Sequence, residues 1–215
     1  MTVKGAPRSY RSPSRSAAAG QTRARIVAAA GALLAAGGQF SLEAVARHAG
    51  VTRLTVYNQF ESRRGLLEAV FDDLAQRGGL FELAAAFADP EPRRALRRVV
   101  TVFCRFWSKH RSMLPKFRAV IQSDAEIAAS LKQRAERRRQ GPTVLVRRLR
   151  DDGGSDSADL VDVLFALTTF EMFEALSVRN RRPKAVEALV QSLVEQAADR
   201  YCASRHTRRP SSASS

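Results

Sequence analysis

The sequence has little cysteine and no long hydrophobic run. Its two cysteines, Cys104 and Cys202, are far apart among 215 residues and match no zinc or redox spacing. A disulfide-stapled mini-protein is therefore excluded, and both residues are predicted to be thiols in a reducing compartment. No apolar run approaches the ~20 residues that a bilayer span requires, and no apolar segment follows the basic N-terminus as in a secretory signal. We expect a cytoplasmic protein without a membrane partner.

Catalytic and metal-binding motifs are also absent from the sequence. It contains no HExxH, P-loop, GxGxxG or GxSxG pattern, and its three histidines, His48, His110 and His206, are isolated from the cysteines. We therefore predict that the protein is not an enzyme and that it holds no metal and no cofactor. A catalytic dyad assembled from residues far apart in the chain is the alternative that a sequence cannot reveal.

Acidic residues are scarce relative to basic ones. The chain has 36 Lys and Arg against 21 Asp and Glu, which gives a net charge of +15 and an isoelectric point near 11.2. The first twenty residues and the tail from Arg200 each carry four basic residues and no acidic one. Such an excess predicts an anionic partner, although charge alone does not identify the anion.

Strand patterns are missing as well, because no stretch alternates apolar and polar residues with β-branched enrichment. The predicted fold class is all-α. Residues 1–20 and 204–215 are rich in Ser, Arg, Ala and Pro with few large apolar side chains, so we predict a disordered basic arm and a disordered tail. The arm either follows a DNA minor groove or only aids solubility, and both alternatives stay open.

The N-terminal part contains four closely spaced helix signals. Thr22 is a plausible N-cap for a first helix that ends at Gly37-Gly38, and Ser41 caps a short second helix that ends at Gly50. Thr52 then caps a third helix of barely two turns, and Ser62 caps a fourth. Two short helices joined by an Ala-Gly-Val turn have the spacing of a helix-turn-helix, which places its second helix in the DNA major groove.

These residues also carry a family resemblance. The segment TRARIVAAAGALLAAGGQFSLEAVARHAGVTRLTVYNQFESRRGLLEAV, residues 22–70, resembles the N-terminal domain of the TetR family of transcriptional regulators. Its most diagnostic parts are VARHAGVTRLTVYNQF and the following S-R-x-G-L-L, in which Arg63 stands near a position where the family usually has Lys. The resemblance implies a DNA-binding domain at 21–77 and a ligand-binding and dimerisation domain at 78–203.

The third helix offers side chains that can read DNA. Arg53 can bond a guanine edge with two hydrogen bonds, and Asn58 can bond an adenine edge or a phosphate. The resemblance assigns Thr52, Thr55 and Tyr57 largely to phosphate contacts. The full set of predicted DNA-binding residues is Arg47, Thr52, Arg53, Leu54, Thr55, Tyr57, Asn58 and Arg63. The alternative is an exposed polar helix face with no partner.

The C-terminal part shows a succession of further helix signals. They are a helix after Asp89–Pro92, one starting near Pro115, one opening at Asp124, one from 158 to 178, and one from Lys184 to Tyr201. Gly141-Pro142 either kinks or breaks the basic helix, and the sequence does not decide between them. The Arg-rich stretch 132–150 is most simply a solvated helix face, with an entrance for an anionic ligand or a second DNA contact as alternatives.

The TetR resemblance also implies a ligand cavity and a four-helix dimer interface in the C-terminal part. The residues we expect around the cavity are aromatic or hydroxyl-bearing: Phe103, Trp107, Phe117, Phe165, Thr168, Thr169 and Phe170. Those we expect in the interface are apolar residues of the last two helices: Leu164, Leu189, Val190, Leu193 and Val194.

The function predicted from these features is sequence-specific DNA binding. A homodimer would bind a palindromic double-stranded operator and respond to an unknown small-molecule inducer, with repression as the family's usual mode. The alternative is a helical ligand-binding or scaffold protein with only non-specific nucleic-acid affinity. Arg53 and Asn58 favour the first hypothesis, because a helix-turn-helix that had lost its specificity would not need side chains that can bond to base edges.

Overall fold

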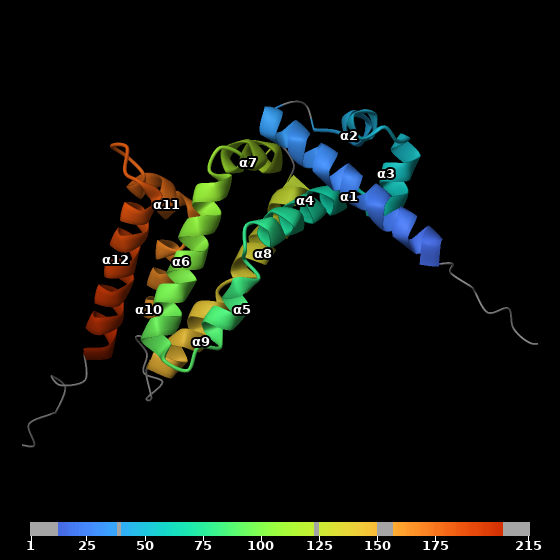
Figure 1. Ribbon diagram of the computed structural model, residues 1–215. Coiled ribbons are helices and arrows are strands. Elements are labelled where there is room, and N and C mark those ends of the chain that lie inside the picture. Colours follow the sequence, from blue (N-terminus) through green and yellow to red (C-terminus); the bar gives the residue numbers. More distant parts are fainter. Residues whose placement is uncertain (1–12, 38–39, 123–124, 150–156, 204–215) are drawn as a thin grey trace, which may run out of the picture. The chain divides into compact units, whose positions relative to one another are not determined.

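A computed structural model describes residues 13–37, 40–122, 125–149 and 157–203 (Figure 1). Every regular element in those ranges is a helix, so the predicted all-α class is confirmed. None of these helices is both long enough and apolar enough to cross a bilayer. The chain divides into two compact units, which end and begin at Asp73 and Leu74, so that α4 contributes residues to both.

The first unit is built from α1, α2, α3 and most of α4. Their bounds are α1 Pro13–Ala36, α2 Leu42–Ala49, α3 Arg53–Phe60 and α4 Arg63–Arg77. Side chains from all four helices are fully buried, among them Ile26, Val45, Val56 and Leu66. Because α2 packs on both α1 and α3, the short helices share one core and are not independent turns.

Capping residues set the boundaries of the short helices, as the sequence predicts. The Ser41 hydroxyl accepts a hydrogen bond from the Ala44 amide, and the Thr52 hydroxyl accepts one from the Thr55 amide. Gly50 ends α2 with a φ of 63°, a left-handed conformation in which glycine is favoured because it has no Cβ. The two caps and this glycine therefore produce the turn between α2 and α3.

The first helix begins earlier than its sequence signal indicates. Thr22 is not an N-cap, because α1 already starts at Pro13. Proline is favoured in the first turn of a helix, and the three alanines at 17–19 are the strongest helix formers. The last part of the predicted disordered arm, residues 13–20, is therefore helical, whereas residues 1–12 lie outside the described ranges.

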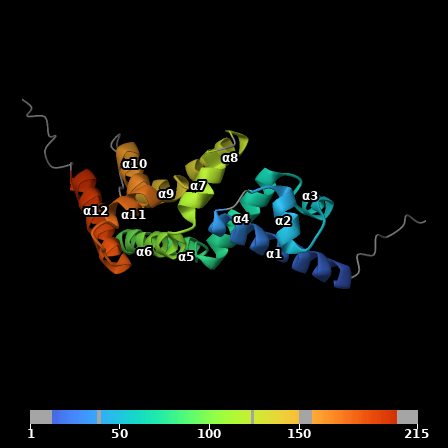
Figure 2. The same ribbon diagram turned by 90° about the horizontal axis from the view of Figure 1, so that it is seen from above.

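The second unit is assembled around α6. Its helices are α5 Glu82–Phe87, α6 Pro92–His110, α7 Leu114–Gln122, α8 Ala125–Arg137, α9 Gln140–Leu149, α10 Ser157–Leu167, α11 Phe170–Leu176 and α12 Pro183–Ala203. Helices α5, α9, α11 and α12 pack directly on α6, and α10 packs on α9 and α12 (Figures 1 and 2). Along α6 the buried side chains recur at helical spacing and include Leu96, Phe103 and Phe106. This helix therefore carries much of the core of the second unit.

Two helices predicted as continuous are interrupted. The segment 158–178 consists of α10 and α11, because the Thr168 hydroxyl bonds back to the Leu164 carbonyl and Thr169 starts a new helix as its N-cap. Before Gly141-Pro142 the chain breaks rather than kinks, since α8 ends at Arg137 and α9 begins at Gln140. Pro142 thus falls in the first turn of α9, where its missing amide hydrogen costs nothing.

Candidate nucleic-acid interface

Helix α3 has one buried and one outward face. Val56 and Phe60 point into the first unit and are buried, while Arg53 and Asn58 are exposed. Leu54 and Tyr57 lie beside them and remain 64% and 54% exposed, although both are large and apolar. Residues three and four apart share one face of a helix. The outward face of α3 therefore combines hydrogen-bonding ends with apolar surface that the described residues leave exposed.

Two threonine hydroxyls meet at the N-terminus of α3. The Oγ1 atoms of Thr52 and Thr55 are 2.8 Å apart, and the Thr52 Oγ1 also accepts from the Thr55 amide at 3.1 Å. Only one hydroxyl proton fits between the two oxygens, so the other is free to point outward. Helix N-termini also attract anions through their amide groups. This end of α3 is therefore suited to donate to a phosphate oxygen.

Arg23 of α1 fixes the opposite end of α3. Its Nη1 donates to the Gln59 carbonyl at 2.7 Å, and its guanidinium carbon lies 4.3 Å from the centroid of the Phe60 ring. A cation at a helix C-terminus is electrostatically favourable, and the stacked ring adds a cation–π contact. Our reading of the sequence missed this residue. No local pattern signals a contact between residues so far apart in the chain.

The turn from α3 into α4 is close-packed. Glu61 takes a left-handed φ of 62° while its amide donates to the Tyr57 carbonyl at 2.7 Å, and the Ser62 hydroxyl caps α4 by accepting from the Gly65 amide at 3.0 Å. A Cβ atom on Gly65 would lie well inside 3.0 Å of the Phe60 carbonyl oxygen, closer than real Cβ atoms approach any neighbour. Glycine at 65 therefore lets α4 start directly against the end of α3.

The two flanking arginines differ in their surroundings. Arg47 is exposed in the last turn of α2. Arg63 is half-buried in the first turn of α4, and its guanidinium carbon is 5.8 Å from the centroid of the Phe40 ring. Arg63 therefore has a packing role in the first unit in addition to any contact with phosphate.

In the second unit, most of the expected cavity residues form one aromatic cluster. Trp107 stacks on Phe103 with ring centroids 6.0 Å apart, and its centroid is 5.8 Å from that of Phe170. The Trp107 Nε1 donates to the Thr168 carbonyl at 3.1 Å. The Arg138 side chain joins the cluster to Phe165, since its guanidinium lies over the rings of both Phe103 and Phe165.

The other two expected cavity residues have separate positions. Thr169 caps α11, and its hydroxyl donates to the Ala166 carbonyl at 2.8 Å. Phe117 is buried on α7. The assignment of either residue to a ligand cavity rests on the family resemblance alone.

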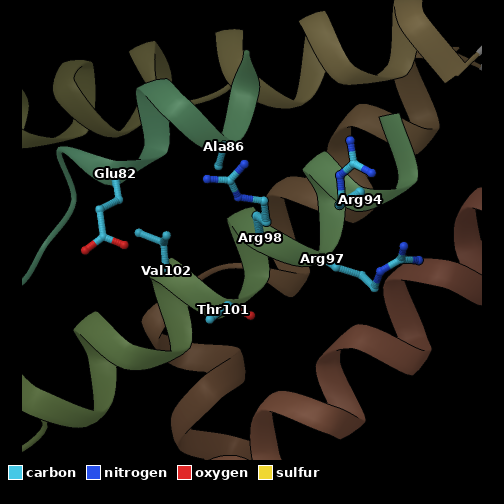
Figure 3. A pocket seen from close by; sticks show the side chains of 7 residues that line it. All are labelled: Glu82, Ala86, Arg94, Arg97, Arg98, Thr101 and Val102. Carbon is cyan, nitrogen blue, oxygen red and sulfur yellow. The ribbon is translucent and has the colours of Figure 1, made fainter. Parts of the chain in front are cut away.

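A hollow of about 270 Å³ lies elsewhere, between α5 and α6 (Figure 3). Its lining includes none of the expected cavity residues and consists of Glu82, Ala86, Arg94, Arg97, Arg98, Thr101 and Val102. The three arginines of this lining already pair with carboxylates. The Asp89 Oδ2 is 2.8 Å from the Arg94 Nε and 3.1 Å from the Arg98 Nη1, and the Glu195 Oε1 is 3.1 Å from the Arg97 Nη1. The hollow is therefore electrostatically compensated.

Asp89 has a structural role in this region. Hydrogen bonds from Arg94, and further ones from the Glu91 amide and Arg98, hold the pKa of its carboxyl well below the usual range. Arg148 also donates to the backbone carbonyls of Phe87 and Asp89. These bonds tie the α5–α6 turn to α9.

Three of the five expected interface residues lie inside the second unit itself. Leu164, Val190 and Val194 are at most 2% exposed and belong to the cluster formed with α6. The chain's own core already covers these three residues, and their assignment to a dimer interface stays a prediction. Leu189 and Leu193 are half-buried on α12 and remain available to a second subunit.

Comparison with known proteins bears on the helix-turn-helix segment and on the fold. Residues 26–70 match the family model described as bacterial regulatory proteins of the tetR family. No curated protein matches the sequence significantly. The fold resembles that of a Mesorhizobium loti protein assigned to the TetR family of transcriptional regulators, with a TM-score of 0.55, 18% identity, and coverage of 86% of this chain and 97% of that one.

A second solved structure is less similar. It is a TetR transcriptional regulator from Streptomyces coelicolor, with a TM-score of 0.45, 24% identity, and coverage of 83% of this chain and 97% of that one. At such identities the structural likeness describes the fold alone, and the family model describes residues 26–70. The family model therefore confirms the resemblance of residues 26–70 to the TetR family of transcriptional regulators.

Proposed function

We propose that this chain, whose helix-turn-helix segment is of TetR type, is a cytoplasmic homodimeric repressor that binds a palindromic operator and releases it on binding a small molecule. The outward face of α3 carries the proposal. In the described part of the chain, Leu54 and Tyr57 are two of the few large apolar side chains left exposed, and they flank the hydrogen-bonding ends of Arg53 and Asn58.

Each exposed side chain of α3 suits one kind of DNA contact. The planar guanidinium of Arg53 matches the two acceptors of a guanine edge, and the Asn58 amide matches an adenine edge or a phosphate. Leu54 offers apolar contact to a thymine methyl group. The Thr52 and Thr55 hydroxyls and Tyr57 suit phosphate oxygens, together with Arg47 and Arg63. The first group supplies specificity, and the second supplies salt-dependent affinity.

A second copy of the chain completes the operator contact. Two-fold protein symmetry demands two-fold DNA symmetry, so half-sites about one helical turn, ~34 Å, or slightly more apart are expected. Leu189 and Leu193 supply the half-exposed apolar stripe of α12 through which the two copies would meet. A ligand at the aromatic cluster would favour one dimer geometry over another and so change operator affinity.

Selection of bound sequences from random duplex DNA tests this function. The expected result is a palindromic sequence. In each half-site, the preference for one base pair should depend on Arg53. Arg53→Ala should relax the base preference at that position and cost about 1–3 kcal/mol there. Arg47→Ala removes an equal charge from α2, beside the recognition helix α3. It should weaken binding to all DNA sequences alike and lower the salt dependence of binding by about one phosphate contact. A bound monomer on a single asymmetric site, or equal effects of both variants on every sequence, contradicts the proposal.

A further inference from the structure

The guanidinium of Arg138, in the segment between α8 and α9, lies among aromatic rings. Its carbon is 5.1 Å from the centroid of Phe103 and 4.5 Å from that of Phe165. One of its nitrogens, Nη1, donates to the Thr168 carbonyl at 3.0 Å. A guanidinium has five N–H donors, and this carbonyl is its one hydrogen-bond acceptor among the described residues. Most of its hydrogen-bonding capacity is therefore unused.

No carboxylate compensates this charge in the ranges that the structure describes. None lies within 4.0 Å of Arg138, whereas the neighbouring Arg139 has two acidic partners, Glu136 at 2.8 Å and Asp162. Arg139 stacks on the same Phe165 ring at 4.1 Å. Two guanidinium groups thus share one aromatic ring, and only one of them is paired with acids. The local charge near Phe165 is therefore left positive at Arg138.

Burial also destabilises the charge of Arg138. Loss of water contact on burial, the largest effect, lowers the pKa of Arg138 to about 10, while the nearby Glu171 acts in the opposite direction and Arg139 in the same one. Glu171 itself pairs with Arg118 at 2.7 Å. Arg138 still carries its charge at neutral pH, but in surroundings where that charge is poorly stabilised. An added anion would restore the missing stabilisation.

The unused donors remain within reach of a ligand. The Arg138 Nε and Nη2 make no hydrogen bond to a described residue, and neither is fully buried. Both therefore keep some exposed surface, although the guanidinium as a whole has lost most of its water contact. The planar fork of a guanidinium matches the two oxygens of a carboxylate, and the surrounding Phe rings match an apolar body.

We propose that Arg138 binds the carboxylate of a small organic acid whose apolar part packs against Phe103 and Phe165, so that the effector of this protein is an apolar monocarboxylate. The proposal rests on the ligand response proposed above and assigns a chemical class to that ligand. A single cation among aromatic rings favours a singly charged, largely apolar acid over a polyanion.

Trp107 is placed to report such binding. Its Nε1 donates to the Thr168 carbonyl, which is also the acceptor for the Arg138 Nη1. A carboxylate that draws the Arg138 guanidinium toward itself alters its hydrogen bond to the Thr168 carbonyl. Because the Trp107 Nε1 donates to the same carbonyl, the surroundings of the indole change as well. Because Trp107 is the single tryptophan of the chain, its fluorescence needs no deconvolution.

The experiment titrates the full-length protein with 3-phenylpropanoate and with its neutral analogue 3-phenylpropanamide at constant ionic strength. Benzoate and hexanoate extend the panel, and sodium chloride is the control for a general salt effect. We expect the acids to shift Trp107 emission and the amide to bind at least tenfold more weakly. Arg138→Met should abolish this preference, Arg138→Lys should retain part of it, and Arg147→Met, which removes an exposed arginine of α9, should leave it unchanged. Circular dichroism checks that each variant is folded.

Three results would overturn the inference: equal binding of acid and amide, an undiminished preference in a folded Arg138→Met variant, or no response of Trp107 to any acid at millimolar concentration. Operator binding is measured in the same samples. Intact operator binding without a carboxylate response removes this inference alone. Absence of operator binding in the ligand-free protein removes the proposed function, whatever the acids do.

Discussion

Alanine at Gly65 should misplace α3, and alanine at Gly31 should not. Both glycines lie in helices of the first unit, where alanine is intrinsically preferred by about 1 kcal/mol. At Gly31 a Cβ meets no atom within 4 Å, so this gain is realised as extra stability. At Gly65 it would overlap the Phe60 carbonyl oxygen, which is backbone and cannot rotate away. The same substitution should therefore have opposite effects at the two positions.

The magnitude at Gly65 follows from two opposing contributions. Overpacking that forces a backbone shift costs about 1–3 kcal/mol, and the helix preference returns up to ~1 kcal/mol. We expect a net destabilisation of about 1–2 kcal/mol in the first unit. Since Phe60 ends α3, the displaced backbone also moves the outward face, and partial loss of base contacts worth ~1–3 kcal/mol each should lower specific operator affinity about tenfold.

Two optical signals separate the units in this experiment. Far-ultraviolet circular dichroism follows all helices during urea unfolding, whereas fluorescence follows Trp107 and hence the second unit. Gly65→Ala should lower the dichroism midpoint and leave the fluorescence midpoint unchanged, and fluorescence anisotropy of labelled operator gives the affinity. Wild-type stability in Gly65→Ala refutes the close approach of α4 to α3. Lost stability with intact operator affinity refutes the link from that contact to DNA binding.

Arg23→Ala should destabilise the first unit by about 1–2 kcal/mol and weaken operator binding, because it removes an exposed charge-assisted hydrogen bond and a cation–π contact. Arg25→Ala, an equal loss of charge at another exposed position of α1, should leave urea stability unchanged, and equal stability of the two variants would argue against a positioning role. Leu193→Asp should convert the dimer to monomer in sedimentation velocity, since an unpaired carboxylate in an apolar seam is strongly unfavourable; a persisting dimer places the interface elsewhere. Burial lowers the pKa of His110 below its usual 6.5, so the unfolded chain takes up a proton first, and stability should fall as pH drops below 6.5; a His110→Phe variant with the same pH slope would contradict this.

Local chemistry made much of the first unit predictable. Ser41, Thr52 and Ser62 act as caps where the sequence indicates them, because capping depends on a side chain and an amide only two or three residues away. The same reasoning failed at Thr22, where a plausible cap lies inside a helix that alanines extend upstream. It also missed α5, whose N-cap residue, Phe81, makes no capping hydrogen bond through its side chain.

Contacts between distant residues were beyond sequence reasoning. An apolar stripe on α12 predicts burial, but it does not say whether the cover is the same chain or a partner, and Val190 and Val194 prove to face their own core. The contact of Arg23 with Gln59 and the place of Arg138 between two phenylalanine rings likewise depend on tertiary packing. The aromatic residues could be identified from the sequence, whereas the sequence did not show that Arg138 lies among them.

The uncovered Leu54 and Tyr57 side chains have a calorimetric consequence. Removal of apolar surface from water lowers the heat capacity, whereas release of counterions from phosphates does not depend on such burial. Operator binding that covers these two residues should therefore have an enthalpy that becomes more negative with rising temperature. Binding to unrelated duplex, held through phosphates alone, should show a much flatter enthalpy. The temperature dependence of the binding enthalpy thus distinguishes a recognition helix inserted in the major groove from one that contacts only the phosphates.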